Sequence, residues 1–187
     1  MQIDETKLIK GCKEGDRIMQ KALYDMYAPK MMGVCMRYTS DRESARDLLQ
    51  EGFVKVFMNF TSYNGTGSLE GWIRKIIVNT ALEYLRKNDV LRNASGFDNF
   101  DQSLYVKIDE TALERLSANE LMKIICELPV GYRTVFNLFV IEGYSHKEIA
   151  EFLNITESTS RSQYVRAKQM LQKKIIIADR ANIKMVL

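Results

Sequence analysis

The sequence predicts an all-α protein of two small helical domains, because apolar residues recur at three- and four-residue spacing along most of its 187 residues. No long stretch alternates apolar and polar residues as a half-buried strand does. Proline occurs only at Pro29 and Pro129, so few helices are interrupted. The segment at 91–116 is polar and weakly periodic. We expect a first domain at 1–90, a flexible acidic linker at 91–116 and a second domain at 117–187.

Charge is distributed unevenly along the chain, although the formal net charge is only +3. Residues 156–184 contain seven Lys or Arg and two Asp or Glu. Residues 94–128 contain three Lys or Arg and seven Asp or Glu. A basic C-terminal segment favours a polyanion as its partner. The alternative is a basic helix that is merely solvated.

The residues that usually bind metals or carry out catalysis are sparse and scattered. Cys12, Cys35 and Cys126 lie far apart, and the chain has a single histidine, so we expect no metal site, no cofactor and no disulfide. No nucleophile–base pair or carboxylate dyad is evident, so we expect no catalytic residue, no small-molecule substrate and no enzyme activity. Neither a signal peptide nor a membrane-spanning apolar run is present, which favours a cytoplasmic location.

The first distinctive helix is expected at 42–60. Its inward face comprises Ala45, Leu48, Leu49, Phe53, Val56 and Phe60. Its outer face carries Asp47, Gln50, Glu51, Val54 and Met58. Two apolar residues among acidic and amide groups indicate a surface that binds another protein; the alternative is two stray apolar residues on a solvated face. Glycine within a helix costs about 1 kcal/mol relative to alanine, so Gly52 predicts a close packing contact.

The second distinctive helix is expected to begin after Ser68, a good N-cap, and to end near Lys87. Its inward face comprises Ile73, Ile76, Ile77, Thr80 and Tyr84, and its opposite face carries Trp72, Lys75, Asn79 and Arg86. An outward tryptophan among cations suits single-stranded nucleic acid, because bases stack on aromatic rings while cations hold the backbone. The alternative is that Trp72 packs under the loop that precedes it.

That loop is glycine-rich and leads into a helix N-terminus. It reads Tyr63, Asn64, Gly65, Thr66, Gly67 and Ser68. Such a loop can cradle a phosphate. It lacks the Gly-Lys-Ser/Thr ending of a nucleotide-binding P-loop, so the sequence argues against nucleotide hydrolysis.

The second domain is expected to begin near Ser117 with a helix whose apolar stripe is Leu121, Ile124, Ile125 and Leu128. Pro129 fits the first turn of the next helix, where its missing N–H costs nothing. That helix is expected to bury Val135, Phe136, Phe139 and Val140, and to end at Gly143.

Two short helices follow, joined by a tight turn. Ser145 and Glu148 form a capping-box pattern for the first of them, whose apolar face is Ile149, Ala150 and Leu153. Asn154 and Ile155 make the turn, and Thr156 can cap the last helix. We expect His146, in a first helical turn, to lie at the surface without a catalytic role.

The last helix combines an apolar face with a polar one. Ser160, Tyr164, Ala167 and Leu171 share one face, while the opposite face near the helix start carries Ser158, Thr159, Ser162 and Arg166, with Arg161 on its flank. Short hydroxyl groups and guanidinium groups can contact phosphates and base edges in a major groove. The pattern predicts a helix-turn-helix; the alternative is an ordinary helical hairpin with a solvated face.

Three stretches in this order resemble an extracytoplasmic-function (ECF) sigma factor of bacterial RNA polymerase. They are DLLQEGFVKVF at 47–57, GWIRKIIVNTALEYLR at 71–86, and LPVGYRTVFNLFVIEGYSHKEIAEFLNITESTSRSQYVRAKQML at 128–171. The resemblance covers nearly the whole chain, with the polar segment where the family has its linker. It implies a transcription initiation factor that binds core RNA polymerase and promoter DNA, with sigma region two before the linker and sigma region four after it.

The resemblance also implies roles for individual residues. Asp47, Gln50, Glu51 and Val54 would dock on the clamp helices of the polymerase β′ subunit. The minus-ten element would be captured by Tyr63, Asn64, Gly65, Thr66, Trp72, Lys75, Asn79 and Arg86. The minus-thirty-five duplex would be read by Ser158, Thr159, Arg161, Ser162 and Arg166. The linker would lie in the RNA exit path, and many members are held inactive by an anti-sigma factor.

The sequence departs from the family pattern in three places. Gly52 replaces a larger residue after the Gln-Glu pair, residues 157–160 read Glu-Ser-Thr-Ser where Gly-Thr-Val is frequent, and residues 178–187 extend beyond the usual end. The second departure leaves the promoter sequence open. An autonomous helix-turn-helix regulator acting as a dimer is the alternative function, although it leaves the faces around Asp47 and Trp72 unused.

Overall fold

The structure is a computed structural model that describes residues 4–39, 41–87 and 116–186, with side chains described to residue 179. All regular elements within these ranges are helical, which confirms the all-α prediction. Contacts divide the chain into two compact units, Met1–Tyr84 and Leu85–Leu187. The predicted linker at 91–116 lies outside the described residues except for Leu116, so its acidic, flexible character and the exact domain limits stay predictions.

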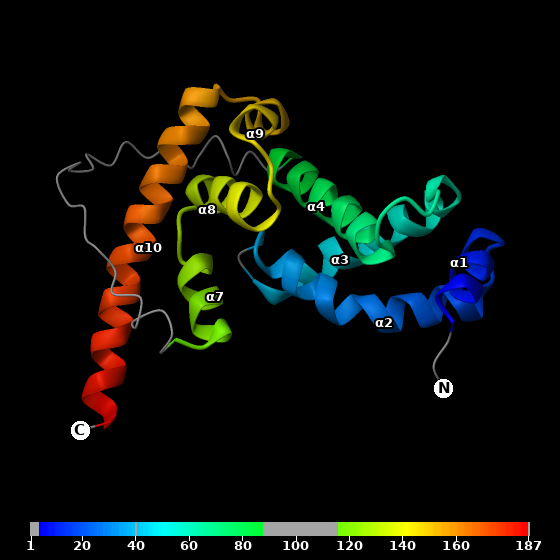
Figure 1. Cartoon of the computed structure of the whole chain (residues 1–187), viewed down its shortest axis with the longest axis horizontal. Coiled ribbons are helices and arrows are strands. Elements are labelled where there is room, and N and C mark those ends of the chain that lie inside the picture. Colours follow the sequence, from blue (N-terminus) through cyan, green and yellow to red (C-terminus); the bar gives the residue numbers. More distant parts are fainter. Residues whose placement is uncertain (1–3, 40, 88–115, 187) are drawn as a thin grey trace. The chain divides into compact units, whose positions relative to one another are not determined.

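The described residues of unit 1 form four α-helices, the last of which continues past Tyr84, and one short 3-10 turn. Figure 1 shows their arrangement. They are α1 (Glu5–Lys13), α2 (Arg17–Met36), α3 (Arg42–Met58), η1 (Phe60–Ser62) and α4 (Leu69–Lys87). Short polar side chains cap the starts of α2 and α3: the Asp16 carboxylate accepts from the Ile18 amide at 2.7 Å, and the Asp41 carboxylate accepts from the Ser44 amide at 2.8 Å. The predicted cap Ser68 accepts from the Gly71 amide at 3.1 Å. These caps satisfy amides that have no partner within their helix.

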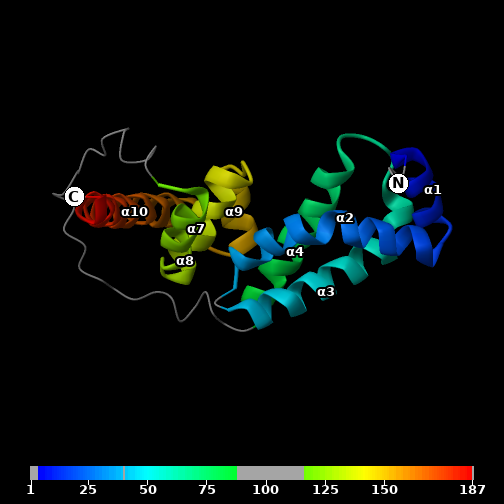
Figure 2. The same cartoon turned by 90° about the horizontal axis from the view of Figure 1, so that it is seen from below.

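Helices α2 and α3 lie side by side (Figure 2), with the rings of Tyr24 and Phe53 4.7 Å apart. The predicted inward face of α3 is buried throughout. The helix ends two residues earlier than expected, because the Asn59 side-chain amide donates to the Lys55 carbonyl and the chain turns into η1. Phe60 is therefore part of the 3-10 turn, although it is buried as predicted.

Gly52 makes the close contact that its position within α3 predicts. A β-carbon placed on Gly52 would lie 2.3 Å from Cδ1 of Ile77 on α4. No non-bonded carbon pair tolerates that distance, so only glycine lets the two helices approach this closely without repacking.

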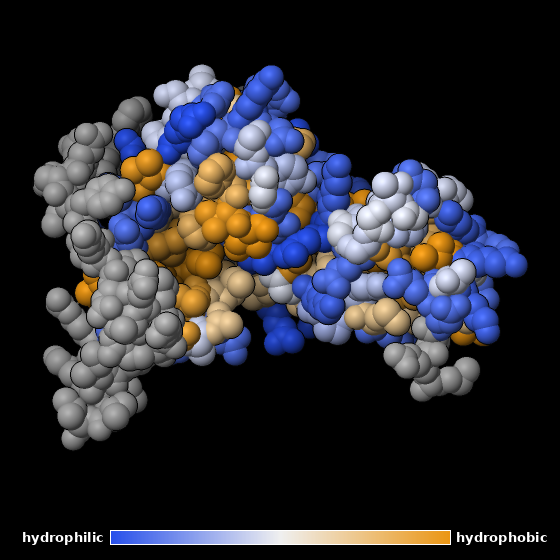
Figure 3. All heavy atoms as spheres, viewed as in Figure 1, coloured by the Kyte–Doolittle hydropathy of each residue, from blue (hydrophilic) through white to orange (hydrophobic). Residues whose placement is uncertain are grey.

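Unit 2 contains α7 (Ala118–Cys126), α8 (Val130–Phe136), the π-helical segment η2 (Asn137–Ile141), α9 (His146–Leu153) and α10 (Glu157–Val186). Helix α10 packs against α7, α8 and α9. Its core cluster comprises Leu116, Ile124, Leu128, Tyr132, Ala167, Leu171 and Ile175. Leu121, Ile125, Phe136 and Met170 border this cluster and are only partly buried, and Figure 3 shows apolar surface over the same part of the unit.

The helix after Pro129 departs from its prediction in two ways. Pro129 is the N-cap of α8, immediately before the first turn in which the sequence placed it. More importantly, Val140 is 50% exposed, whereas Leu138 and Asn137 are fully buried. The reason is the π-helical segment, in which the Glu142 amide donates to the carbonyl of Asn137 five residues earlier. The wider turn rotates the following residues relative to an α-helix, so the face extrapolated at 3.6-residue spacing is wrong beyond Phe136.

Candidate nucleic-acid interface

The outer face of α3 is exposed as the sequence predicts. Asp47, Gln50 and Glu51 are exposed, and so are the apolar side chains of Val54 (56%) and Met58 (77%). The alternative of stray apolar residues is disfavoured by their spacing, since residues four apart adjoin on one helical face. An apolar pair bordered by carboxylates and an amide is suited to a protein partner.

The acidic side of this face is held by a lysine. Nζ of Lys55 lies 3.0 Å from a Glu51 carboxylate oxygen and 2.7 Å from a Glu83 oxygen on α4. Partial burial alone would lower the pKa of Lys55, but hydrogen bonds to Glu83 and Glu51 outweigh it and raise the pKa. Lys55 therefore stays protonated and ties α3 to α4 beneath the exposed face.

The loop before α4 is shaped by its two glycines and by local hydrogen bonds. Gly65 and Gly67 have φ angles of 81° and 77°, which L-residues rarely adopt. The Asn64 side-chain oxygen accepts from the Thr66 amide at 2.9 Å, and the Tyr63 hydroxyl donates to the Gly67 carbonyl at 3.0 Å. The loop thus presents Asn64, Gly65 and Thr66 to solvent.

Tyr63 is placed differently from the other residues of the loop. It is 3% exposed and packs between Phe60 and Trp72, with ring centroids 6.4 Å and 5.3 Å away. Its position shapes the loop from beneath, so its ring is not displayed to solvent in this structure.

Trp72 is half-buried, with its ring edge-on to Phe60 at 5.5 Å and tilted against Tyr63. Trp72 thus packs against the preceding loop, as the alternative for this residue expected, while part of its ring stays accessible to solvent. On the same helix Lys75 and Arg86 are exposed and Asn79 is half-buried. The loop and the outer face of α4 therefore form one surface in which an anchored aromatic ring lies beside cations and an amide.

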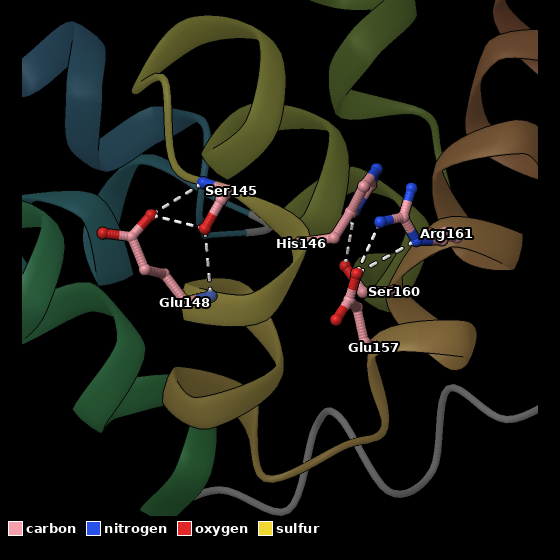
Figure 4. Close-up of polar contacts among 6 residues, drawn as sticks. All are labelled: Ser145, His146, Glu148, Glu157, Ser160 and Arg161. Atoms are coloured by element: carbon pink, nitrogen blue, oxygen red, sulfur yellow. Dashed lines mark hydrogen bonds and ion pairs between the residues drawn. The ribbon is translucent and has the colours of Figure 1, made fainter.

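Helices α9 and α10 have the predicted helix-turn-helix arrangement. The Ser145 hydroxyl and the Glu148 carboxylate form the reciprocal capping box at the start of α9 (Figure 4). Asn154 ends α9 with a φ of 52°, the left-handed conformation that allows a tight turn. The Thr156 hydroxyl accepts from the Thr159 amide at 3.0 Å and caps α10.

The predicted recognition residues of α10 differ in how they are held. Ser158, Arg161 and Ser162 are exposed, whereas Thr159 and Arg166 are half-buried. The Ser162 hydroxyl donates to the Thr159 carbonyl at 2.9 Å, and Arg161 pairs with Glu157 through Nε at 3.1 Å.

Arg166 differs in being held by another helix. It donates through Nη1 to the Tyr132 hydroxyl on α8 at 3.3 Å. Exposed donors therefore lie in the first two turns of α10, and Arg166 is anchored behind them.

His146 is buried, which contradicts the expectation of a surface residue. Only 8% of it is exposed, and its Nδ1 lies 2.9 Å from Oγ of Ser160 (Figure 4). Its ring stacks on Phe139, with the ring centroids 4.3 Å apart. Burial lowers its pKa, as does the nearby charge of Arg161, while Glu157 acts in the opposite direction. The prediction was wrong because it considered only the position of His146 in the first turn of α9, whereas the ring packs against α10. Ser160, a polar residue within the apolar stripe of α10, was the one sign in the sequence that a buried polar partner lies nearby.

Other kinds of site find no support in the described part of the chain. No group of three His, Cys, Asp or Glu side chains there could hold a metal ion. Nor does any helix of the described ranges combine the length and apolarity needed to cross a membrane.

Comparison with known proteins agrees with this geometry. Residues 23–90 match the family model described as Sigma-70 region 2, and residues 118–171 match that described as Sigma-70, region 4. The chain is 29% identical over 185 residues to the ECF RNA polymerase sigma-E factor of Haemophilus influenzae, covering 93% of this chain and 96% of that protein. It is 28% identical over 184 residues to the ECF RNA polymerase sigma factor SigW of Bacillus subtilis, covering 94% and 98%.

The fold is also similar to a solved structure of the sigma factor RpoE of Bartonella quintana in complex with the anti-sigma factor NepR. The superposition covers 85% of this chain and 97% of the RpoE chain, with 20% sequence identity and a TM-score of 0.48. The two region matches, in order and together spanning most of the chain, define a sigma factor of the sigma-70 family. Within that family the chain belongs to the extracytoplasmic-function group, with whose members it aligns almost end to end.

Proposed function

We propose that this sigma factor directs promoter-specific initiation through three surfaces: the outer face of α3 for core polymerase, the loop and outer face of α4 for the minus-ten element, and the start of α10 for the minus-thirty-five duplex. It acts as a non-enzymatic subunit in the cytoplasm, where the polymerase works. An anti-sigma factor that covers one of these surfaces is the expected regulator.

The observation that carries this proposal is the exposed apolar pair Val54 and Met58 beside Asp47, Gln50 and Glu51. An autonomous DNA-binding dimer has no use for such a face on a helix outside its helix-turn-helix. A sigma factor needs one, because it acts only when docked on polymerase. The apolar pair supplies buried area, and the carboxylates and amide select a partner with basic and polar groups at matching positions.

The α4 surface suits the minus-ten element because it combines a π-surface with cations. Trp72 is held in place by Phe60 and Tyr63, so a base can stack on its exposed part without ordering the ring first. Lys75 and Arg86 lie where they can contact phosphates. The exposed loop residues Asn64, Gly65 and Thr66 can contact a base taken out of the stack.

The start of α10 suits a duplex because exposed hydroxyl groups and a guanidinium lie within its first two turns. A recognition helix of a helix-turn-helix enters the major groove by its N-terminal residues. Arg161 can form bidentate contacts with a guanine edge once it releases Glu157, and Ser158 and Ser162 can bond phosphates or bases.

The test is the affinity for core RNA polymerase of the Val54→Glu variant. Introducing a charge at a buried hot spot should weaken binding by about 2 kcal/mol or more, roughly thirtyfold. Stability should hardly change, because Val54 is more than half exposed. Ile18→Glu on α2, where the native side chain is 73% exposed, is the matched control and should bind as the wild type does. Equal affinity of all three proteins would remove α3 from the polymerase interface.

A further inference from the structure

A polar pair lies inside the helix-turn-helix where apolar packing would be expected. His146 is the first residue of α9, and Ser160 lies in the first turn of α10. They are 8% and 0% exposed, and Nδ1 of His146 is 2.9 Å from Oγ of Ser160 (Figure 4). A buried hydrogen bond between two helices fixes their relative orientation more closely than apolar contact does, because it has a preferred direction as well as a distance.

The imidazole ring itself is held on two sides. Phe139 of η2 stacks on it with centroids 4.3 Å apart and an interplanar angle of 9°. Tyr164 of α10 lies 5.8 Å away at 57°. Because the stack on Phe139 sets the plane of the ring, the ring meets Ser160 from one direction. The hydrogen bond therefore fixes the position of the start of α10 relative to both η2 and α9.

We propose that His146 is a positioning residue for promoter recognition, which through Ser160 fixes how the first turn of α10 is presented to the minus-thirty-five duplex. The inference rests on the proposed reading of that duplex by α10. Arg161 and Ser162 directly follow Ser160, so rotation of this turn displaces their side chains from the base edges. Recognition groups need support that locks their placement to a fraction of an ångström, and this pair supplies it.

The protonation state of the ring provides a readout that packing alone would not give. The charged or titratable groups that face it from α10 are Arg161, Glu157 and Tyr164, and Phe139 of η2 adds no charge. Burial and then the Arg161 charge lower the pKa of His146 from its usual 6.5, while Glu157 raises it. The neutral ring is therefore the form that fits the fold. Its contribution is present above pH 6.5 and is lost as pH falls through the lowered pKa.

The experiment measures discrimination by the polymerase holoenzyme between a promoter with an intact minus-thirty-five element and the same promoter with that element replaced. The ratio of the two affinities is determined at about pH 7.5 and about pH 5, because the lowered pKa of His146 places its titration below the ordinary histidine value of about 6.5. Affinity for core polymerase and for a fork-junction probe that carries only the minus-ten element serves as the internal reference.

Three single variants and one double variant separate the hydrogen bond from the ring. His146→Phe keeps the stack on Phe139 but cannot bond Ser160, and we expect a loss of discrimination of about fivefold, the size of one net hydrogen bond. Ser160→Ala should lose the same amount of discrimination. The His146→Phe/Ser160→Ala double variant should lose no more than either single variant, because each substitution removes the same hydrogen bond. His146→Asn places an amide near the Nδ1 position, so it should retain most of the discrimination and make it independent of pH.

The outcomes are distinguishable. Wild-type discrimination that falls at the lower pH, together with pH-independent discrimination in His146→Asn, supports the proposal. Additive losses in the double variant, or the same pH profile in wild type and His146→Asn, would overturn it while leaving the proposed function intact. A wild-type holoenzyme that ignores the minus-thirty-five element at both pH values would overturn the proposed reading by α10 as well.

Discussion

Cδ1 of Ile77 lies only 2.3 Å from where a β-carbon on Gly52 would be. At this point a side chain of α4 therefore lies directly against the backbone of α3. The same two helices carry the proposed polymerase face and the proposed minus-ten face on their outer sides. Their close approach sets the placement of one surface relative to the other within the unit.

Gly52→Ala should destabilise unit 1 in spite of the better helix propensity of alanine. Ile77 is fully buried, so its Cδ1 can turn away only by disturbing the side chains packed around it, and overpacking of this kind costs about 1–3 kcal/mol. The propensity gain offsets about 1 kcal/mol of this cost. Urea denaturation followed by circular dichroism should show a lower midpoint.

Gly33→Ala in α2 is the matched control for that variant. No atom of the described residues lies within 4 Å of a β-carbon there, and the residue is exposed. We expect this change to raise stability by about 0.5–1 kcal/mol. A stabilising Gly52→Ala would mean that the α3–α4 contact yields without cost.

Trp72→Ala should impair promoter opening more than binding to core polymerase. The substitution removes a stacking surface worth about 1–3 kcal/mol per base. Heparin-resistant open complexes and core affinity are measured on the same preparation.

Because Trp72 also packs on Phe60 and Tyr63, a readout of folding is needed alongside. Trp72→Phe keeps an aromatic ring and should open promoters better than Trp72→Ala. Losses of equal size in opening and in core binding would assign Trp72 to the core of unit 1 alone.

Arg166→Ala should weaken recognition of the minus-thirty-five duplex by about 1–3 kcal/mol, the range of a bidentate base contact. Tyr132→Phe removes only the hydroxyl that accepts from Arg166 at 3.3 Å and leaves the guanidinium in place. It should therefore cost much less. Competition binding of the holoenzyme on single-base promoter variants provides the measurement, and a cost for Tyr132→Phe equal to that for Arg166→Ala would make Arg166 a structural residue instead.

The three thiols should differ in reactivity. Burial, aided by the Asp16 charge, raises the pKa of Cys12 to about 11, and burial raises that of Cys35 to about 12. At about pH 8 both side chains are therefore thiols, and the thiolate form that attacks alkylating reagents is scarce. Mass spectrometry after brief iodoacetamide treatment should find label on the half-buried Cys126 and on the other two only after unfolding. Equal labelling of all three in the folded chain would contradict the burial of Cys12 and Cys35.

Most of the fold follows from local patterns that the structure repeats. The buried faces of α3 and α10, the capping box at Ser145 and the turn at Asn154 depend on residues a few positions apart, so spacing and capping chemistry predict them. The exposure of Val54 and Met58 was predictable for the same reason, since a helical wheel places both residues on the side of α3 opposite its apolar stripe.

The misplaced residues depend on features that no local pattern carries. A π-helical turn at Asn137–Ile141 rotates Val140 out of the core, and helical spacing in the sequence does not reveal such a turn. His146 is buried because Ser160, fourteen residues later, offers it a hydrogen bond. Tyr63 and Trp72 lie against each other, and both rings contact Phe60 at the start of η1. Each is a tertiary contact that composition and period do not report.

The most direct test of the central claim is run-off transcription by core RNA polymerase on a pool of fragments from the source genome, with and without this protein. We predict discrete new transcripts that require the protein, share two upstream elements, and disappear with Val54→Glu while persisting with Ile18→Glu. Absence of new transcripts, together with tight duplex binding by the protein alone as a dimer, would contradict the claim and favour an autonomous helix-turn-helix regulator.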